Sequence, residues 1–168
     1  IWTRAETVAP NHAWRGVDYG APSDTQLVSP PLQVASGKSF VIKFDHRFKF
    51  EAADEEEGRV FYDGAVIEIS EDNGGSWKDV ATYKDPGYGG KITDVSGNPL
   101  AGKMAMVDDN PSWPKTDAVR LDLGSKLGGK TVKVRFRIGT DQAAGDFGWE
   151  IDNLAFEALS VGAIGWVA

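Results

Sequence analysis

Acidic side chains offer the clearest chemistry in this sequence. The chain contains 25 Asp and Glu, no Cys and only two His. Disulfides, thiolate metal sites and cysteine nucleophiles are therefore excluded. Carboxylate, amide and backbone carbonyl oxygens are the ligands that Ca²⁺ prefers, and loops rich in Asp and Gly present them readily. We therefore expect a structural calcium ion. The candidate ligands are two aspartates of an early loop, one on the polar face of a strand, and two more near strand ends: Asp18, Asp24, Asp45, Asp63 and Asp152.

Four of these five aspartates also have a purely structural interpretation. Asp18 and Asp24 would stabilise turns, Asp45 would pair with a neighbouring Lys or Arg, and Asp152 would accept backbone amides. A further acidic run spans residues 51–57 (EAADEEE). This run would form a second cation site or a solvated loop tip. The loop tip is favoured, because close like charges repel and prefer water unless an ion neutralises them.

Catalytic patterns are weak. A zinc peptidase of the H-E-x-x-H type needs two histidines on one helix, whereas His12 and His46 are far apart and on no predicted helix. His46 is in phase with apolar residues on the core face of a strand, which favours a neutral, hydrogen-bonded core histidine over a triad base. A glycosidase needs a pair of carboxyls, but with so many acids such a pair is uninformative. We expect no enzymatic activity.

The elements that must position these residues are strands. Residues 39–50 alternate apolar and polar side chains with a period of two, and shorter alternations recur at 65–69, 119–123 and 132–138. No segment keeps a helical apolar spacing, and 20 Gly and 8 Pro interrupt the chain. Strands with one apolar face each bury it by packing two sheets together. The sequence therefore predicts an all-β fold, a two-sheet antiparallel β-sandwich.

Three irregularities modify this pattern. Pro30-Pro31 removes two backbone donors, so the segment 27–34 should be an edge strand or be broken there. At Asp152-Asn153 one extra residue interrupts the alternation, which predicts a bulge that re-aims Asp152. Residues 84–117 form a long irregular region rich in Gly, Pro, Asp and Asn, and long loops in compact domains are uncommon unless functional or mobile.

Composition limits the partners. The formal net charge is -7, which argues against nucleic acid and anionic membranes as partners. No apolar run approaches the roughly 20 residues that span a bilayer.

The length fits one domain, residues 1–168. The chain does not begin with Met, and its last residues, 161–168 (VGAIGWVA), are apolar. We therefore expect a piece of a larger protein, with the termini, including Trp166, sealing the core or facing the remainder.

Ser70 to Trp77 (SEDNGGSW) resembles an Asp-box, the S-x-D-x-G-x-x-W hairpin of sialidases and many secreted β proteins. Its aspartate would accept hydrogen bonds from the amides of the turn, and its glycines permit positive φ. Sialidase propellers carry several copies in separate blades, whereas this chain has one. The motif therefore predicts a hairpin rather than an activity.

A wider resemblance covers roughly residues 14–156. It rests on the Asp-box hairpin together with short motifs at 29–32 (SPPL), 44–48 (FDHRF), 62–70 (YDGAVIEIS), 98–100 (NPL), 134–137 (VRFR), 139–141 (GTD) and 148–153 (GWEIDN). Together these resemble the MAM-like jelly-roll accessory domains of secreted bacterial metallopeptidases of the immune-inhibitor-A type. The resemblance implies a jelly roll, an extracellular location, a non-catalytic role, often a bound calcium, and a catalytic peptidase domain as the partner in the parent protein.

Two aromatic residues of the long irregular region are candidate ligand-binding residues. Exposed aromatic rings offer flat faces for sugar rings or peptide side chains, and Tyr88 and Trp113 are placed for this role. The alternative for Trp113, between two prolines, is that it caps the edge of the sandwich. We expect an accessory or recognition module, with two alternatives: a carbohydrate-binding module that binds extracellular polysaccharide, or a purely structural domain packed on a catalytic neighbour.

Overall fold

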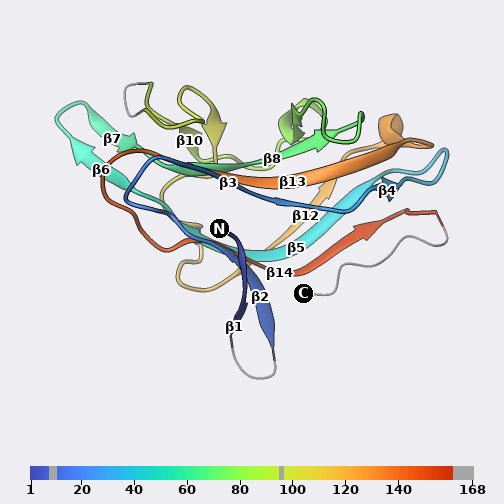
Figure 1. Cartoon of the computed structure of the whole chain (residues 1–168), viewed down its shortest axis with the longest axis horizontal. Coiled ribbons are helices and arrows are strands. Elements are labelled where there is room, and N and C mark those ends of the chain that lie inside the picture. The colour runs from blue at the N-terminus through green and yellow to red at the C-terminus, as the bar shows by residue number, and fades with distance from the viewer. Residues whose placement is uncertain (8–10, 95–96, 161–168) are drawn as a thin grey trace.

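The fold is a β-sandwich, seen in a computed structural model that describes residues 1–7, 11–94 and 97–160. Two antiparallel sheets pack face to face (Figure 1). The described residues include no α-helix, only two single-turn 3₁₀ segments, η1 (Val80–Thr82) and η2 (Ser125–Leu127). None of the described segments is a helix long and apolar enough to cross a membrane. The expectation of an all-β sandwich is confirmed.

The first sheet has five strands. In spatial order they are β1 (Thr3–Glu6), β2 (His12–Gly16), β14 (Gly148–Glu157), β5 (Val41–Lys49) and β12 (Asp117–Asp122). The predicted alternation at 39–50 corresponds to β5, whose inward side chains, from Phe40 to Phe50, are all buried. The predicted bulge is also present, because the pairing of β14 with β5 shifts register between Asp152 and Ala155.

The second sheet is built around β13. Its strands are β3 (Ser23–Val28), β13 (Thr131–Thr140), β8 (Gly64–Ser70), β9 (Lys78–Asp79) and β4 (Leu32–Gln33), which also pairs with β13. β3 and β4 pair with the same strand and are separated by Pro30-Pro31. The predicted break at the two prolines is therefore confirmed, because neither proline can donate to the ladder.

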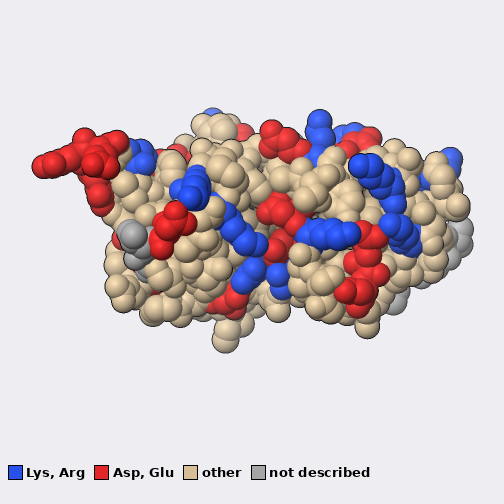
Figure 2. Space-filling view, turned by 90° about the horizontal axis from the view of Figure 1, so that it is seen from above, with Lys and Arg blue, Asp and Glu red and all other residues tan. Residues whose placement is uncertain are grey.

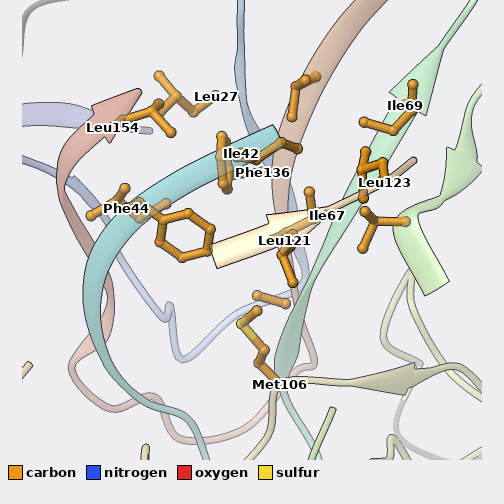
Figure 3. Close-up of a cluster of buried hydrophobic side chains, with 14 of the residues drawn as sticks. Leu27, Ile42, Phe44, Ile67, Ile69, Met106, Leu121, Leu123, Phe136 and Leu154 are labelled. Carbon is orange, nitrogen blue, oxygen red and sulfur yellow. The ribbon is translucent and has the colours of Figure 1, made fainter. Parts of the chain in front are cut away.

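The main core fills the space between the sheets. The Phe136 ring, from the second sheet, lies 5.6 Å from the Phe44 ring and 5.5 Å from the Trp149 ring of the first. Figure 3 shows side chains of both sheets meeting in this layer, among them Leu27, Ile42, Phe44, Ile67, Ile69, Leu121, Phe136 and Leu154. Edge-to-face aromatic pairs of this kind stabilise a core beyond the area they bury.

A second, smaller core lies on the outer face of β8. It contains Val66, Ile92, Leu100, Ala105 and Val107. The long irregular region folds over this face and forms a short hairpin, β10 (Gly90–Lys91) with β11 (Met104–Ala105). Every residue of β8 is therefore buried, on both faces of the sheet. The region is a packed cover and not a free loop.

Besides β10–β11, a second hairpin belongs to neither of the two sheets. β6 (Ala52–Glu55) and β7 (Gly58–Phe61) pair only with each other. We call this hairpin, residues 52–61, the arm. It extends from one end of the sandwich (Figure 1), and its tip, residues 54–57 (DEEE), is exposed. In Figure 2 the same acidic residues form the projection at the left. The solvated tip predicted for the acidic run 51–57 is present at residues 54–57, whereas Glu51, at its start, is half-buried.

Candidate metal centre

Four carboxylates meet at the end of the sandwich from which the arm extends. Asp18 lies between β2 and β3, Glu51 between β5 and β6, and Asp63 between β7 and β8, while Asp141 directly follows β13. One carboxylate oxygen from each of Glu51, Asp63 and Asp141 lies within 4.8 Å of the others. Asp18 adjoins this group through Asp63, since the two carboxyls are close enough to share a hydrogen bond when one is protonated. We call these four residues the carboxylate cluster.

Backbone amides fix one side of the cluster. Asp18 Oδ2 accepts hydrogen bonds from the amides of Glu51 and Asp146, each at 3.0 Å. Asp63 Oδ1 accepts from the amide of Asp141 at 2.7 Å and from Asn98 Nδ2 at 3.2 Å. Loops that are far apart in sequence are therefore tied together at this point.

The loop that carries Asp18 needs a glycine as its neighbour. Gly148 has φ 87°, and a Cβ added there would lie 2.7 Å from the Asp18 backbone nitrogen. A side chain at this position would be strained and would push the Asp18 loop away. The first residue of β14 therefore has to be small for Asp18 to reach the cluster.

The other side of the cluster lacks hydrogen-bond donors. Asp18 Oδ1, Glu51 Oε2 and Asp63 Oδ2 are buried and have no hydrogen-bond partner. Asp63 is 0% exposed, and Asp18 and Asp141 are each 4% exposed. A buried charge without a partner is costly, so it is normally paired or bound to a metal. A positive charge or a shared proton would satisfy these three oxygens.

No basic side chain supplies that charge in the part of the chain that the structure describes. The nearby Lys49 pairs instead with Asp146, at 2.9 Å. Burial, together with the neighbouring carboxylates, raises the pKa of Asp63 well above its ordinary value. Burial likewise raises the pKa of Asp18 and of Glu51, the latter also through the charges of Asp141 and Asp18. These are the shifts expected where like charges crowd together without a cation.

The cluster suits a hard divalent cation. Four carboxylates from four loops supply oxygen ligands only, and exposed backbone carbonyls or water would complete a shell of six to eight, as Ca²⁺ requires. Nitrogen and sulfur ligands, which zinc and copper favour, are not part of it. Of the five aspartates proposed from the sequence, the structure brings two to this cluster, Asp18 and Asp63.

The other three aspartates lie elsewhere and have protein partners. Asp24 accepts two hydrogen bonds from Arg137, each at 2.7 Å, and this pairing lowers the pKa of Asp24. Asp45 accepts from Asn153 Nδ2 at 2.7 Å. Asp152 accepts from Asn11 Nδ2, also at 2.7 Å, and from the amide of Asn153. Asp152, where the register shift of β14 begins, is therefore not part of the cluster.

Sequence reasoning did not name Asp141, and it included Glu51 only in the acidic run 51–57, for which a second cation site was the less favoured alternative. Glu51 is the first residue of the acidic run and the only one of its acids that turns inward. Asp141 is the residue directly after the strand Thr131–Thr140. The sequence did carry a signal for both residues. Asp141 directly follows one alternating strand and Glu51 lies two residues after another, and carboxylates at strand ends lie together at the end of a sandwich.

The two candidate aromatic residues lie in different settings. The Tyr88 hydroxyl accepts from the Ile67 amide at 3.0 Å and donates to Asp79 at 3.1 Å, and burial raises its pKa strongly. Trp113 is half-buried, with its ring 5.0 Å from the Phe147 ring. Tyr88 thus anchors the long irregular region to β8, and Trp113 packs at the outer edge of the first sheet. Trp166 lies outside the described residues.

The Asp-box hairpin has the hydrogen bonds its sequence predicts. Asp72 accepts from the Ser76 amide at 2.8 Å and from the Ser76 hydroxyl at 2.6 Å. Asn73 and Gly74 have positive φ, 59° and 99°. The Trp77 ring packs beneath the Arg135 guanidinium, 4.3 Å from its centre.

Comparison with known proteins adds no relatives. No protein-family model matches the sequence, and no curated protein matches it significantly.

Proposed function

We propose that the chain is a calcium-stabilised, non-catalytic module of a secreted hydrolase, with a jelly-roll arrangement of its sandwich. One observation carries the proposal: three buried carboxylate oxygens without hydrogen-bond partners, from Asp18, Glu51 and Asp63, lie in a cluster without a basic residue. A Ca²⁺ ion there would neutralise the cluster and join four loops. The millimolar calcium of extracellular fluids is sufficient for a site of modest affinity.

The finer parts of the proposal rest on other features. In the order of strands along the chain, β2, β5, β12 and β14 lie in one sheet and β3, β8, β9 and β13 in the other, which is the arrangement expected of a jelly roll of eight strands. A non-catalytic role is supported by the position of His46, 6% exposed and bonded through Nδ1 to Trp149 Nε1 at 3.2 Å. The module would carry out no reaction itself. It would hold a peptidase domain of the parent protein near its target and so raise the effective concentration of the peptidase there.

A carbohydrate-binding role has less support. Tyr88 is committed to hydrogen bonds inside the fold. The outer cluster of Trp113 and Phe147 is covered by Arg15 and Arg47, whose guanidinium carbons lie 4.0 and 5.0 Å from the centre of the Phe147 ring. A sugar would have to displace these side chains before it could stack.

The proposal is tested by the thermal midpoint of unfolding in excess EDTA and again after calcium is added back. A ligand that binds only the folded state at a hundred times its Kd stabilises it by about 2.7 kcal/mol. For a chain of this length this corresponds to a rise of about 5 to 10 °C. Isothermal titration calorimetry gives the affinity directly.

The controls use charge-removing variants of equal size. Asp63→Asn should abolish most of the calcium-dependent rise and, in EDTA, should unfold at a higher temperature than the wild type because a buried, crowded carboxylate is removed. Asp152→Asn and Asp45→Asn, which alter acids outside the cluster, should keep the full rise. An unchanged wild-type midpoint on calcium addition, with no heat of binding, would exclude the calcium site.

A further inference from the structure

We infer that the cation of the carboxylate cluster controls the arm, holding it fixed when bound and leaving it loosely tethered when absent; this inference rests on the proposed calcium site. The argument begins with chain order. Glu51 immediately precedes β6, and Asp63 follows β7 after a single intervening residue. Both chain segments that leave the sandwich to form the arm therefore pass through the cluster.

The buried residues of the cluster belong to the body of the sandwich. Asp63 is wholly buried, and its Oδ2 has no hydrogen-bond donor. Asp18 and Asp141 come from the loop after β2 and from the end of β13. A cation bound by all four would cross-link both ends of the arm to two strands of the body. Such a cross-link closes the base of the arm as a metal clip closes a loop.

Contacts other than the cluster hold the arm mainly at its base, where Phe61 packs against the small core over β8 and Asn98 Nδ2 donates to the Tyr62 carbonyl at 2.9 Å. Also at the base, the Tyr62 amide donates to the Glu51 carbonyl at 3.1 Å, and the Thr93 amide donates to the Phe61 carbonyl at 2.8 Å. Few contacts hold the rest of the arm. Further out, Arg59 donates to Asp108 at 2.9 and 2.6 Å, but both side chains are partly exposed. Exposed ion pairs contribute little to stability. Nothing in either sheet pairs with β6 or β7 within the described residues.

Repulsion opens the arm when the cation is absent. Glu51 and Asp63 then face each other and Asp141 with oxygens less than 4.8 Å apart. Four more acids lie close together at the exposed tip, with Arg59 beside them. Asp63 is wholly buried and accepts hydrogen bonds from the Asp141 amide and Asn98, so it stays in place. The half-buried Glu51 relieves the crowding by moving away from it, and the start of β6 moves with Glu51. The acidic tip is therefore held in one position only when the cation is bound.

Hydrogen–deuterium exchange of the whole chain, in 5 mM calcium and in EGTA, tests the inference. We expect the amides of residues 52–61 to exchange at least about tenfold more slowly with calcium. The Asp-box hairpin, residues 70–78, is an internal control because it is similarly exposed but contributes no carboxylate to the cluster. Calorimetry on the same samples reports whether calcium binds.

The outcomes separate the two proposals. Binding with slower exchange in the arm and little change in the Asp-box hairpin supports the inference. Binding with unchanged arm exchange, or with equal slowing in both hairpins, overturns it and leaves the calcium site standing. Absence of binding overturns both.

A reciprocal experiment uses linkage, because coupling between two sites acts equally in both directions. Arg59→Ala removes the tie to Asp108 and loosens the arm without touching the cluster. It should weaken calcium binding by about two- to fivefold, the range for an exposed ion pair. Lys78→Ala, which breaks a comparable exposed pair with Glu71 on the Asp-box hairpin, should leave the affinity unchanged. Equal affinities in both variants would contradict the coupling.

Discussion

Lowering the pH from 7 to 5 is expected to destabilise the fold through one buried side chain, His46. The ring lies in the main core between the rings of Phe44 and Phe48, with centroids 5.2 and 5.3 Å away. Its Nδ1 accepts the hydrogen bond of Trp149 Nε1. A protonated imidazole has no acceptor nitrogen, so protonation removes this bond and places a charge in the core.

The magnitude follows from the pKa. Burial lowers the pKa of His46 from 6.5 to about 4, and the charges of Asp117 and Asp45 offset only part of this effect. Because the pKa is lower in the fold, the unfolded chain takes up its proton first as the pH falls. The stability is complete above pH 6.5 and is lost between pH 6.5 and about 4. At 1.36 kcal/mol per pKa unit, the full loss is about 3 kcal/mol, of which about 2 kcal/mol falls between pH 7 and pH 5.

Urea unfolding, followed by tryptophan fluorescence at pH 7 and pH 5, measures this loss. His46→Asn is the matched variant, because the Asn Oδ1 takes the place of Nδ1 as the acceptor for Trp149 but does not titrate. Both proteins are measured in excess calcium, so that titration of the carboxylate cluster cancels in the difference. We expect the wild type to lose about 2 kcal/mol more than the variant over this range. Parallel losses would refute the assignment of His46 as a neutral core residue.

Two further predictions concern the outer parts of the fold. Leu100→Ala, in the small core over β8, should lower the free energy of unfolding by about 3 kcal/mol, because the side chain is wholly buried. Met104→Ala, on the neighbouring exposed hairpin, should change it by less than about 0.5 kcal/mol; similar losses in both urea titrations would mean that the cover is not packed. Asp72→Ala should lower the thermal midpoint, because the Asp-box turn loses the hydrogen bonds from Ser76 and from Ser70 Oγ. A midpoint equal to that of Glu56→Ala, at the tip of the arm, would show that the motif does not stabilise the hairpin.

The central strands were predictable because burial repeats along them with the period of a strand. In β5 and β13 every second residue enters the same core, so the alternation is visible in the sequence. In β8 it is less visible, because the long irregular region covers the outer face. The short pairs β6–β7 and β10–β11 were not predicted, because strands of two to four residues carry too little alternation to be recognised.

The cluster was predictable only in part, because it depends on proximity in space rather than on spacing in the chain. Asp18 and Asp63 stand beside glycines and turns, which marked them as candidates. Asp24 has a similar setting, but the register of β3 on β13 brings it to Arg137. That register depends on which strands pair, and a single sequence does not show this.

The positions of β13 and β14 have a consequence for how the protein is made. Among the described residues these are the last two strands to be synthesised, yet β13 joins β3 to β8 and β14 joins β2 to β5. Until residue 131 and beyond emerge, neither sheet can form, and the earlier strands have open edges and uncovered apolar faces. The nascent chain therefore stays incompletely folded and exposed to aggregation until residues 131–157 have emerged. A truncated product ending before β13 would be a target for chaperones and proteases rather than a smaller version of the fold.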